Sequence, residues 1–177
     1  VTPLVLVKVA EERSSATTML KFLTDHRRSR RQRELAALEL FVDLGLREMQ
    51  IVDGLVHERH YLKGEVIFDQ GEEGQAIYFI LQGKVIICPQ GCPESPIVTL
   101  ERGNSFGELA LLDDAPRSAQ ARAAEDCTLA VFFRGDFLGL MGSHAVIASK
   151  ISLRLARQLG ARLRGAQHAA LSDRPGV

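Results

Sequence analysis

The 177-residue sequence lacks an excess of charge of either sign, since 22 Lys and Arg balance 22 Asp and Glu. Proteins that bind nucleic acid along their whole length usually carry a basic excess, so this composition argues against that class. No apolar run approaches the ~18 residues that a membrane-spanning helix needs, which rules out a transmembrane protein for this fragment. Three cysteines, an odd number, do not form a disulfide framework. A reducing, cytoplasmic setting is the simplest interpretation.

Hydrophobic residues make up 46% of the chain, which is enough to bury a core. At ~150 residues per domain, the length predicts one globular domain with terminal extensions. The sequence begins at Val1 rather than Met, so it is either a processed product or a piece of a longer protein. Its first seven residues are too short, and lack the basic front end, for a signal peptide.

The amino-terminal part of the chain has helical periodicity. From Glu11 to about Val56, apolar residues recur at spacings of three and four. Within this zone, Arg27–Arg33 holds five arginines in seven residues. Such a run is either a phosphate-binding or membrane-surface patch, or a solvated helix face or linker. The run lacks interleaved aromatic residues, which favours the second interpretation.

The middle of the chain has the texture of short β-strands. Runs of β-branched and aromatic residues alternate with glycine-bearing turns about every eight to twelve residues, a spacing typical of an antiparallel sandwich, roll or barrel. The predicted strands are 65–69, 76–81, 84–88, 97–100 and 127–133, with a polar–apolar alternation over 118–122. The middle of the chain is therefore predicted to be all-β.

A long amphipathic helix is predicted after a short segment at Phe137–Met141. Its apolar residues recur every four positions, at Ile147, Ile151, Leu155, Leu159 and Leu163. A repeat of four drifts about 40° per step against 3.6 residues per turn, so the apolar stripe winds around the helix. We expect one end of the stripe to contact the sheet and the other to contact a partner helix.

The segment from Phe106 to Ala119 carries the chemistry. It predicts a short helical turn opened by Gly107, and a helix start offers unpaired N–H groups and a positive dipole end to a phosphate. Arg117 could place its planar fork on two phosphate oxygens. Glu108 could accept a hydrogen bond from a hydroxyl group. Together these features suit a small sugar phosphate, although Glu108 and Arg117 could instead simply pair with each other.

The sequence resembles the cyclic nucleotide-binding domain family over about residues 40–165. The resemblance rests on an ordered set of motifs: Gly64-Glu65, Gly71 with Gly74, Phe79–Gly83, Gly103, Phe106–Leu112 and Pro116–Ala119. It implies a mainly β fold, an eight-stranded antiparallel roll flanked by helices, that binds cAMP or cGMP without a metal. The chain then divides into a helical or linker segment (1–36), the β-roll (37–145) and a lid or dimerisation helix with its tail (146–177).

The same resemblance implies roles for individual residues. Arg117 holds the exocyclic phosphate oxygens and Glu108 takes the ribose 2′-hydroxyl. Ser118 lies beside a phosphate cradle, which is completed by the backbone amides around Gly107, Leu109, Ala110 and Ala119. At the base end, Arg162 or Leu163 lies over the purine, and Arg162 is either a cation–π partner of the ring or a solvated charge. Ser118 does not decide between cAMP and cGMP.

The resemblance implies a cyclic nucleotide sensor, with cAMP favoured over cGMP, that changes conformation and relays the change to a fused or partner effector. The expected partners are a second copy, through the carboxy-terminal helix, and an upstream effector that could lie in a membrane. Only 14 residues follow Leu163, too few for a helix-turn-helix domain, so no DNA-binding domain is expected. The alternative is a ligand-free structural or dimerisation module of the same fold.

An enzyme is the competing class. His57 and His60, the adjacent Asp113 and Asp114, and the pair Cys88 and Cys92 are the residues that could support catalysis or bind metal. Adjacent carboxylates in a turn have no fixed acid–base geometry, and no further ligand stands at zinc spacing from the cysteines. We therefore expect no catalytic activity and no metal, and a location in the cytoplasm, alone or as the cytoplasmic part of a larger protein.

Overall fold

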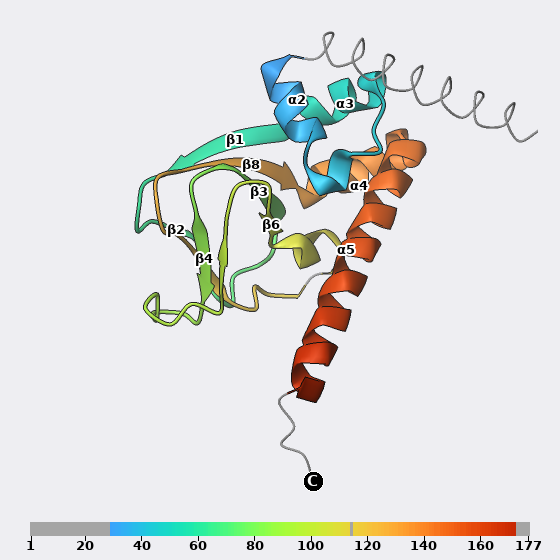
Figure 1. Cartoon of the computed structure of the whole chain (residues 1–177). Coiled ribbons are helices and arrows are strands. Elements are labelled where there is room, and N and C mark those ends of the chain that lie inside the picture. The colour runs from blue at the N-terminus through green and yellow to red at the C-terminus, as the bar shows by residue number, and fades with distance from the viewer. Residues whose placement is uncertain (1–28, 114, 173–177) are drawn as a thin grey trace, which may run out of the picture.

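The computed structural model describes residues 29–113 and 115–172 (Figure 1). Within these ranges, eight strands form two four-stranded antiparallel sheets, and helices cover one side of the roll. This architecture confirms the predicted fold class. The helical pattern over 11–28, the first two arginines of the basic run, Asp114 and the last five residues lie outside the described part.

Three short helical elements precede the strands: α2 (Arg30–Ala36), η1 (Glu39–Phe41) and α3 (Leu46–Asp53). Ser29 and Gln32 form a capping box at the start of α2. The Glu48 carboxylate accepts the Gly45 N–H at the start of α3, at 2.7 Å. The helical pattern expected to reach Val56 ends at Asp53, because Val56 pairs with Phe132 and begins the first strand.

The two sheets have different neighbours. In the first sheet the order is β1 (Val56–Tyr61), β8 (Cys127–Phe133), β3 (Ala76–Gln82) and β6 (Ser105–Phe106). In the second it is β2 (Val66–Phe68), β7 (Gln120–Ala123), β4 (Val85–Cys88) and β5 (Val98–Leu100). The 3-10 turn η2 (Glu108–Leu111) leaves the roll directly after β6.

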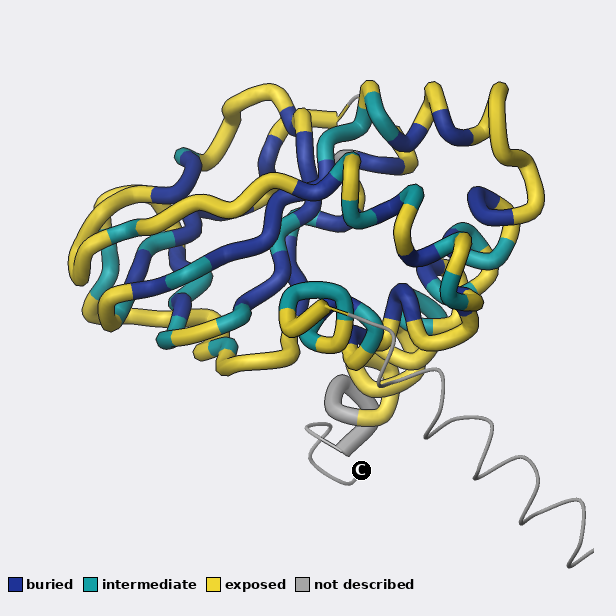
Figure 2. The backbone as a smooth tube through the Cα atoms, turned by 90° about the horizontal axis from the view of Figure 1, so that it is seen from above, coloured by how far each residue is buried: buried dark blue, intermediate teal, exposed yellow. Residues whose placement is uncertain are grey.

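The first sheet separates two hydrophobic cores. Ile80 and Leu129 face the second sheet and pack with side chains such as Val85. Phe79 and Phe132 face the other way and pack against the helices. Alternate residues of β3 and β8 thus serve two cores, and these central strands are buried on both sides (Figure 2). Full burial of such side chains stabilises the fold by about 1.5–3 kcal/mol each.

Two helices follow the roll: α4 (Arg134–Ser143) and α5 (Ala145–Ser172). The predicted segment over 137–141 is thus the middle of a full helix. Along α5, Ile151 and Leu155 are fully buried and Leu159 is partly buried, whereas Leu163 is 61% exposed. The first half of the stripe packs against α4 and η1, in the same core as Phe79 and Phe132 of the first sheet. The second half extends beyond the helical core (Figure 1).

Candidate ligand-binding site

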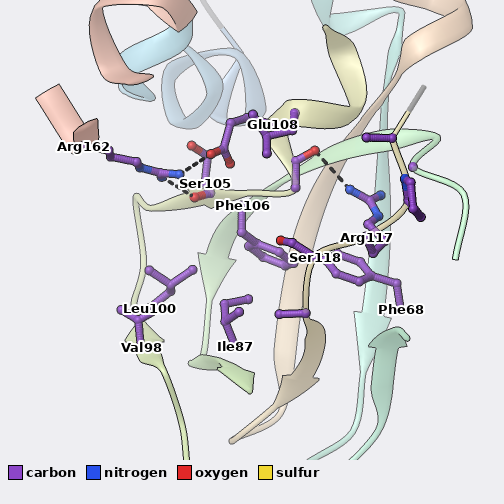
Figure 3. A pocket seen from close by; sticks show the side chains of 16 residues that line it. Phe68, Ile87, Val98, Leu100, Ser105, Phe106, Glu108, Arg117, Ser118 and Arg162 are labelled. Atoms are coloured by element: carbon purple, nitrogen blue, oxygen red, sulfur yellow. Dashed lines mark hydrogen bonds and ion pairs between the residues drawn. The ribbon is translucent and has the colours of Figure 1, made fainter. Parts of the chain in front are cut away.

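A cavity of about 440 Å³ opens between η2, the 115–119 segment, strands β4 and β5, and the outer half of α5. Arg162 and Glu108 lie on one side of it and Arg117 lies on the opposite side (Figure 3). The cavity contains all of the predicted site residues except Ala110, which belongs to η2: Gly107, Glu108, Leu109, Arg117, Ser118, Ala119 and Arg162. Leu163, the alternative candidate for the base, is not among the lining residues.

Gly107 makes the turn between β6 and η2 and adopts a left-handed conformation, with φ +71°. A Cβ atom at this position would lie 2.5 Å from Nη1 of Arg117. Glycine is therefore required twice, for the backbone angle and for the space that the guanidinium fills.

The backbone of Arg117 is fixed by the loop that follows β2. Its N–H donates to the Glu72 carbonyl at 2.7 Å, and its carbonyl accepts the Gly71 N–H at 2.9 Å. The side chain then runs inward. Its guanidinium donates to the carbonyls of Ala76 at 2.9 Å and Gly107 at 3.1 Å.

Arg117 is 8% exposed and forms no direct ion pair among the described residues: its guanidinium donates to two neutral carbonyls, and Tyr78, Glu72 and Glu108 add only weaker electrostatic interactions. Its Cζ lies 4.1 Å from the centre of the Phe68 ring, a cation–π contact, and its Nε has no hydrogen-bond partner. Burial lowers the pKa of the guanidinium, although an arginine remains charged at neutral pH. The cavity wall thus carries a desolvated cation that has no carboxylate in direct contact among the described residues.

Glu108 is also buried, but it does not pair with Arg117. Its Oε1 accepts a hydrogen bond from Nη1 of Arg162, and Nη2 of Arg162 donates to the Ser105 carbonyl at 2.9 Å. Gln158 donates to the Ser105 hydroxyl at 3.0 Å. The alternative in which Glu108 and Arg117 only neutralise each other is therefore wrong. The outer half of α5 is instead attached to the Glu108 side of the cavity.

The part of the cavity that is formed by β4 and β5 is apolar. Ile87 and Val98 face each other across β4 and β5, and Leu100 continues the same surface. The sequence places these residues in strands, but alternation alone does not tell which face of a strand borders a cavity. Phe68, under Arg117, was also missed, because the pairing of β2 with β7 brings it there from a distant part of the chain.

Helix α5 also joins the cavity to the amino-terminal helices. Arg154 forms a bidentate pair with Asp43, at 2.6 and 2.7 Å, and Lys150 pairs with Glu48 at 2.7 and 2.8 Å. These hydrogen bonds lower the pKa of both carboxyl groups. One row of polar side chains, spaced four residues apart, runs along α5: Lys150, Arg154, Gln158 and Arg162. The first two pair with the amino-terminal segment, and the last two form hydrogen bonds at the cavity.

The residues considered for catalysis or metal binding lie outside this cavity, apart from Asp114, which is not among the described residues. The His57 ring packs edge-on against Phe133, and His60 contacts Thr128. Burial raises the pKa of the Cys88 thiol, and none of these residues lines the cavity. Among the described residues, no group of three or more His, Cys, Asp and Glu could hold a metal ion.

Comparison with known families identifies the domain. Residues 58–144 match the family model described as the cyclic nucleotide-binding domain. The chain contains a cyclic nucleotide-binding domain. This match begins within β1, continues through β8 and α4, and includes every residue that lines the cavity except Arg162 of α5.

Relatives of this cyclic nucleotide-binding domain occur in larger proteins. Over 122 residues the chain is 38% identical to the Cyclic AMP receptor protein of Thermus thermophilus, covering 68% of this chain and 56% of that protein. Over 117 residues it is 36% identical to a cyclic nucleotide-gated potassium channel of Rhizobium etli, covering 66% of this chain and 32% of the channel. The chain thus spans just over half of the length of the first relative and just under a third of the second.

A solved structure supports the fold. The cyclic nucleotide-binding domain from Methylobacillus flagellatus superposes with a TM-score of 0.70 at 22% identity, covering 83% of this chain and 84% of that one. In the described part of our chain, no helix combines the length and the apolar character needed to cross a membrane.

Proposed function

We propose that this domain binds a purine 3′,5′-cyclic nucleotide, cAMP in preference to cGMP, and acts as a sensor rather than as an enzyme. The observation that carries the proposal is the Arg117 guanidinium, a buried cation whose Nε has no partner and which borders the same cavity as Glu108. A buried charge without a counter-ion is costly, and a bound anion offsets that cost.

The cyclic phosphate carries one negative charge, which matches one guanidinium. Arginine has five N–H donors, and the carbonyls of Ala76 and Gly107 account for two of them, so donors remain for phosphate oxygens. The backbone N–H groups around Leu109, Ala110 and Ala119, with Ser118 beside them, complete the proposed cradle. Glu108 accepts the ribose 2′-hydroxyl from the other side.

The base is then left with the apolar end of the cavity, formed by Ile87, Val98 and Leu100. Guanine presents both a carbonyl and an amino group on its edge, and burial of such groups without partners costs more than burial of the adenine edge. The relative from Thermus thermophilus, a Cyclic AMP receptor protein, favours the same base.

The proposed output is a relay through α5. Arg162 and Gln158 attach this helix to the cavity, and Arg154 and Lys150 attach it to the segment that holds α3. A ligand that reaches Glu108 therefore acts on a helix that also holds the amino-terminal elements. A ligand shifts such an equilibrium only by its difference in affinity between the two states.

Two partners complete the proposal. The exposed outer half of α5 offers Leu163 to a second copy of the chain, and an effector fused upstream would receive the movement of the amino-terminal helices. The Rhizobium etli relative is a potassium channel, which is one form that such an effector takes. A structural module without a ligand is the alternative, favoured by the same exposed leucine.

The thermal stability of the purified chain tests the proposal. At a concentration of 100 times its dissociation constant, a ligand stabilises the folded state by about 2.7 kcal/mol. We expect the melting temperature to rise with cAMP, less with cGMP, and least with AMP, whose phosphate is not cyclic. No shift with millimolar cAMP or cGMP would overturn the proposal and leave the structural module. Equal shifts with cAMP and cGMP would overturn the base preference alone.

A further inference from the structure

Arg162 is the residue of α5 whose position differs most from the expectation. From the sequence, Arg162 is expected either to stack on the purine or to be a solvated charge. In the structure, both of its terminal nitrogens donate hydrogen bonds to other residues of the protein. Nη1 donates to the Glu108 carboxylate and Nη2 donates to the Ser105 carbonyl at 2.9 Å (Figure 3). Both acceptors lie on the sugar side of the proposed ligand, away from the apolar wall of Ile87 and Val98.

The burial of the two partners is unequal. The Glu108 side chain is 9% exposed and the Arg162 side chain is 44% exposed, so the carboxylate depends on the guanidinium more than the reverse. Within the described ranges, Arg162 is the ion-pair partner of Glu108. Removal of one partner of a buried pair leaves the other charge uncompensated, and that charge then gains by turning toward water. Without Arg162, the carboxylate would lose the orientation in which it faces the cavity.

We propose that Arg162 is a positioning residue for the sugar subsite: it holds the Glu108 carboxylate ready for the 2′-hydroxyl, and so sets the selectivity for ribose over 2′-deoxyribose rather than the choice of base. This proposal rests on the proposed function. It assigns to a residue on α5 an effect that passes through Glu108 and not through direct contact with the purine.

Stacking on the base and positioning of Glu108 predict different effects of Arg162 on the affinity for ligands with and without the 2′-hydroxyl. A guanidinium stacked on the base would contribute equally to the binding of cAMP and 2′-deoxy-cAMP, because both carry the same adenine. A guanidinium that acts through Glu108 contributes only when the 2′-hydroxyl is present. The loss of one hydrogen bond to a charged group corresponds to about 1.4 kcal/mol or more, which is about tenfold in affinity.

The experiment is a double-mutant cycle measured with two ligands. Calorimetry gives the dissociation constants of cAMP and 2′-deoxy-cAMP for the wild type, Arg162→Ala, Glu108→Gln and the double variant. We expect the wild type to prefer cAMP by about tenfold or more, and Arg162→Ala to lose most of that preference. Its affinity for 2′-deoxy-cAMP should change by less than about threefold, and in the Glu108→Gln background the second substitution should have little further effect.

Two further variants sharpen the result. Arg164→Ala removes an exposed arginine from the same helix, outside the cavity lining, and should leave both affinities unchanged. Arg162→Lys keeps the charge beside Glu108 but cannot bridge to Ser105 as a fork does, so it should restore part of the preference. Melting of each variant without ligand verifies that it folds.

Three outcomes would overturn the inference. Equal weakening of both ligands by Arg162→Ala would place the guanidinium on the base or give it a purely structural role. Unchanged selectivity would make it a solvated charge. Additive effects of the two substitutions would separate Arg162 from Glu108. If the wild type bound neither ligand, the proposed function itself would fail, which is a distinct result.

Discussion

At the residue scale, Arg117 combines two properties that conflict in a ligand-free protein. It is a permanent cation and it is almost completely buried, in contact with two neutral carbonyls and with the rings of Phe68 and Tyr78. Cation–π and carbonyl contacts offset part of the desolvation cost, but a bound anion would offset more of it. The affinity for a cyclic phosphate should therefore depend strongly on this single side chain.

We expect Arg117→Ala to weaken cAMP binding by about one hundredfold or more, from the loss of ~3 kcal/mol of charge-assisted hydrogen bonds. Arg117→Lys should weaken it as well, because an ammonium group cannot bond two phosphate oxygens as a planar fork does. Calorimetric titration of both variants provides the measurement. Affinity at the wild-type level in either variant would remove Arg117 from the proposed site.

The sequence alone could predict that Glu108 and Arg117 share a site, because their motif fixes both residue types within one short segment. It could not predict the partner of Glu108. Arg162 comes from a helix far along the chain, and its approach depends on how α5 packs against α4 and η1. The platform of Phe68 was missed for the same reason, since it follows from strand pairing and not from local spacing.

At the element scale, α5 has two halves that are held by different forces. The half that contains Ile151 and Leu155 is held by the apolar core and by ion pairs to Asp43 and Glu48. Beyond Leu159, Arg162 forms side-chain hydrogen bonds to the roll, and Leu163 of the apolar stripe is exposed. A ligand at Glu108 should therefore act mainly on the outer half.

Hydrogen exchange measures this directly. With saturating cAMP, we expect the amide protection of residues 157–168 to change, whereas protection over 147–155 should stay nearly constant because that segment is fixed in the core. Arg117→Ala, under the same conditions, serves as the control that should show no change. Identical exchange of the outer half with and without ligand would disprove the relay while leaving binding intact.

Elements were predicted where periodicity and burial agree. Strands β3 and β8 were evident from their apolar runs, and the long helix from its repeat of four. Strand β1 was missed, because four of its six residues are exposed and its polar side chains give little pattern. The elements that pack against α5 could not be predicted. Its apolar stripe shows that one face of the helix is buried, but not which element buries it.

At the scale of the whole molecule, the outer end of the apolar stripe on α5 lies outside the core. Leu163 is 61% exposed at a position where the same stripe is buried two turns earlier, at Leu155. Association of two copies through this part of α5 would complete the burial of the stripe. The proposed dimer and the proposed relay would then share one helix.

Sedimentation velocity across a concentration series tests the dimer. We expect the wild type to associate reversibly, and Leu163→Glu to shift the equilibrium toward the monomer because it would bury a charge in the interface. Leu138→Glu, at an exposed leucine on α4, is the matched control. A wild type that stays monomeric at high concentration, or equal effects of the two substitutions, would contradict this assembly.

The unpartnered Nε of Arg117 has a consequence for attempts to raise the thermal stability of this protein. An uncharged side chain of similar length, as in Arg117→Met, could rest on Phe68 without dehydrating a cation, and would favour the empty fold. Laboratory evolution toward heat tolerance, carried out without nucleotide, should thus drift away from arginine and produce robust but insensitive descendants. In this protein, the arginine that allows nucleotide binding lowers the stability of the fold without nucleotide.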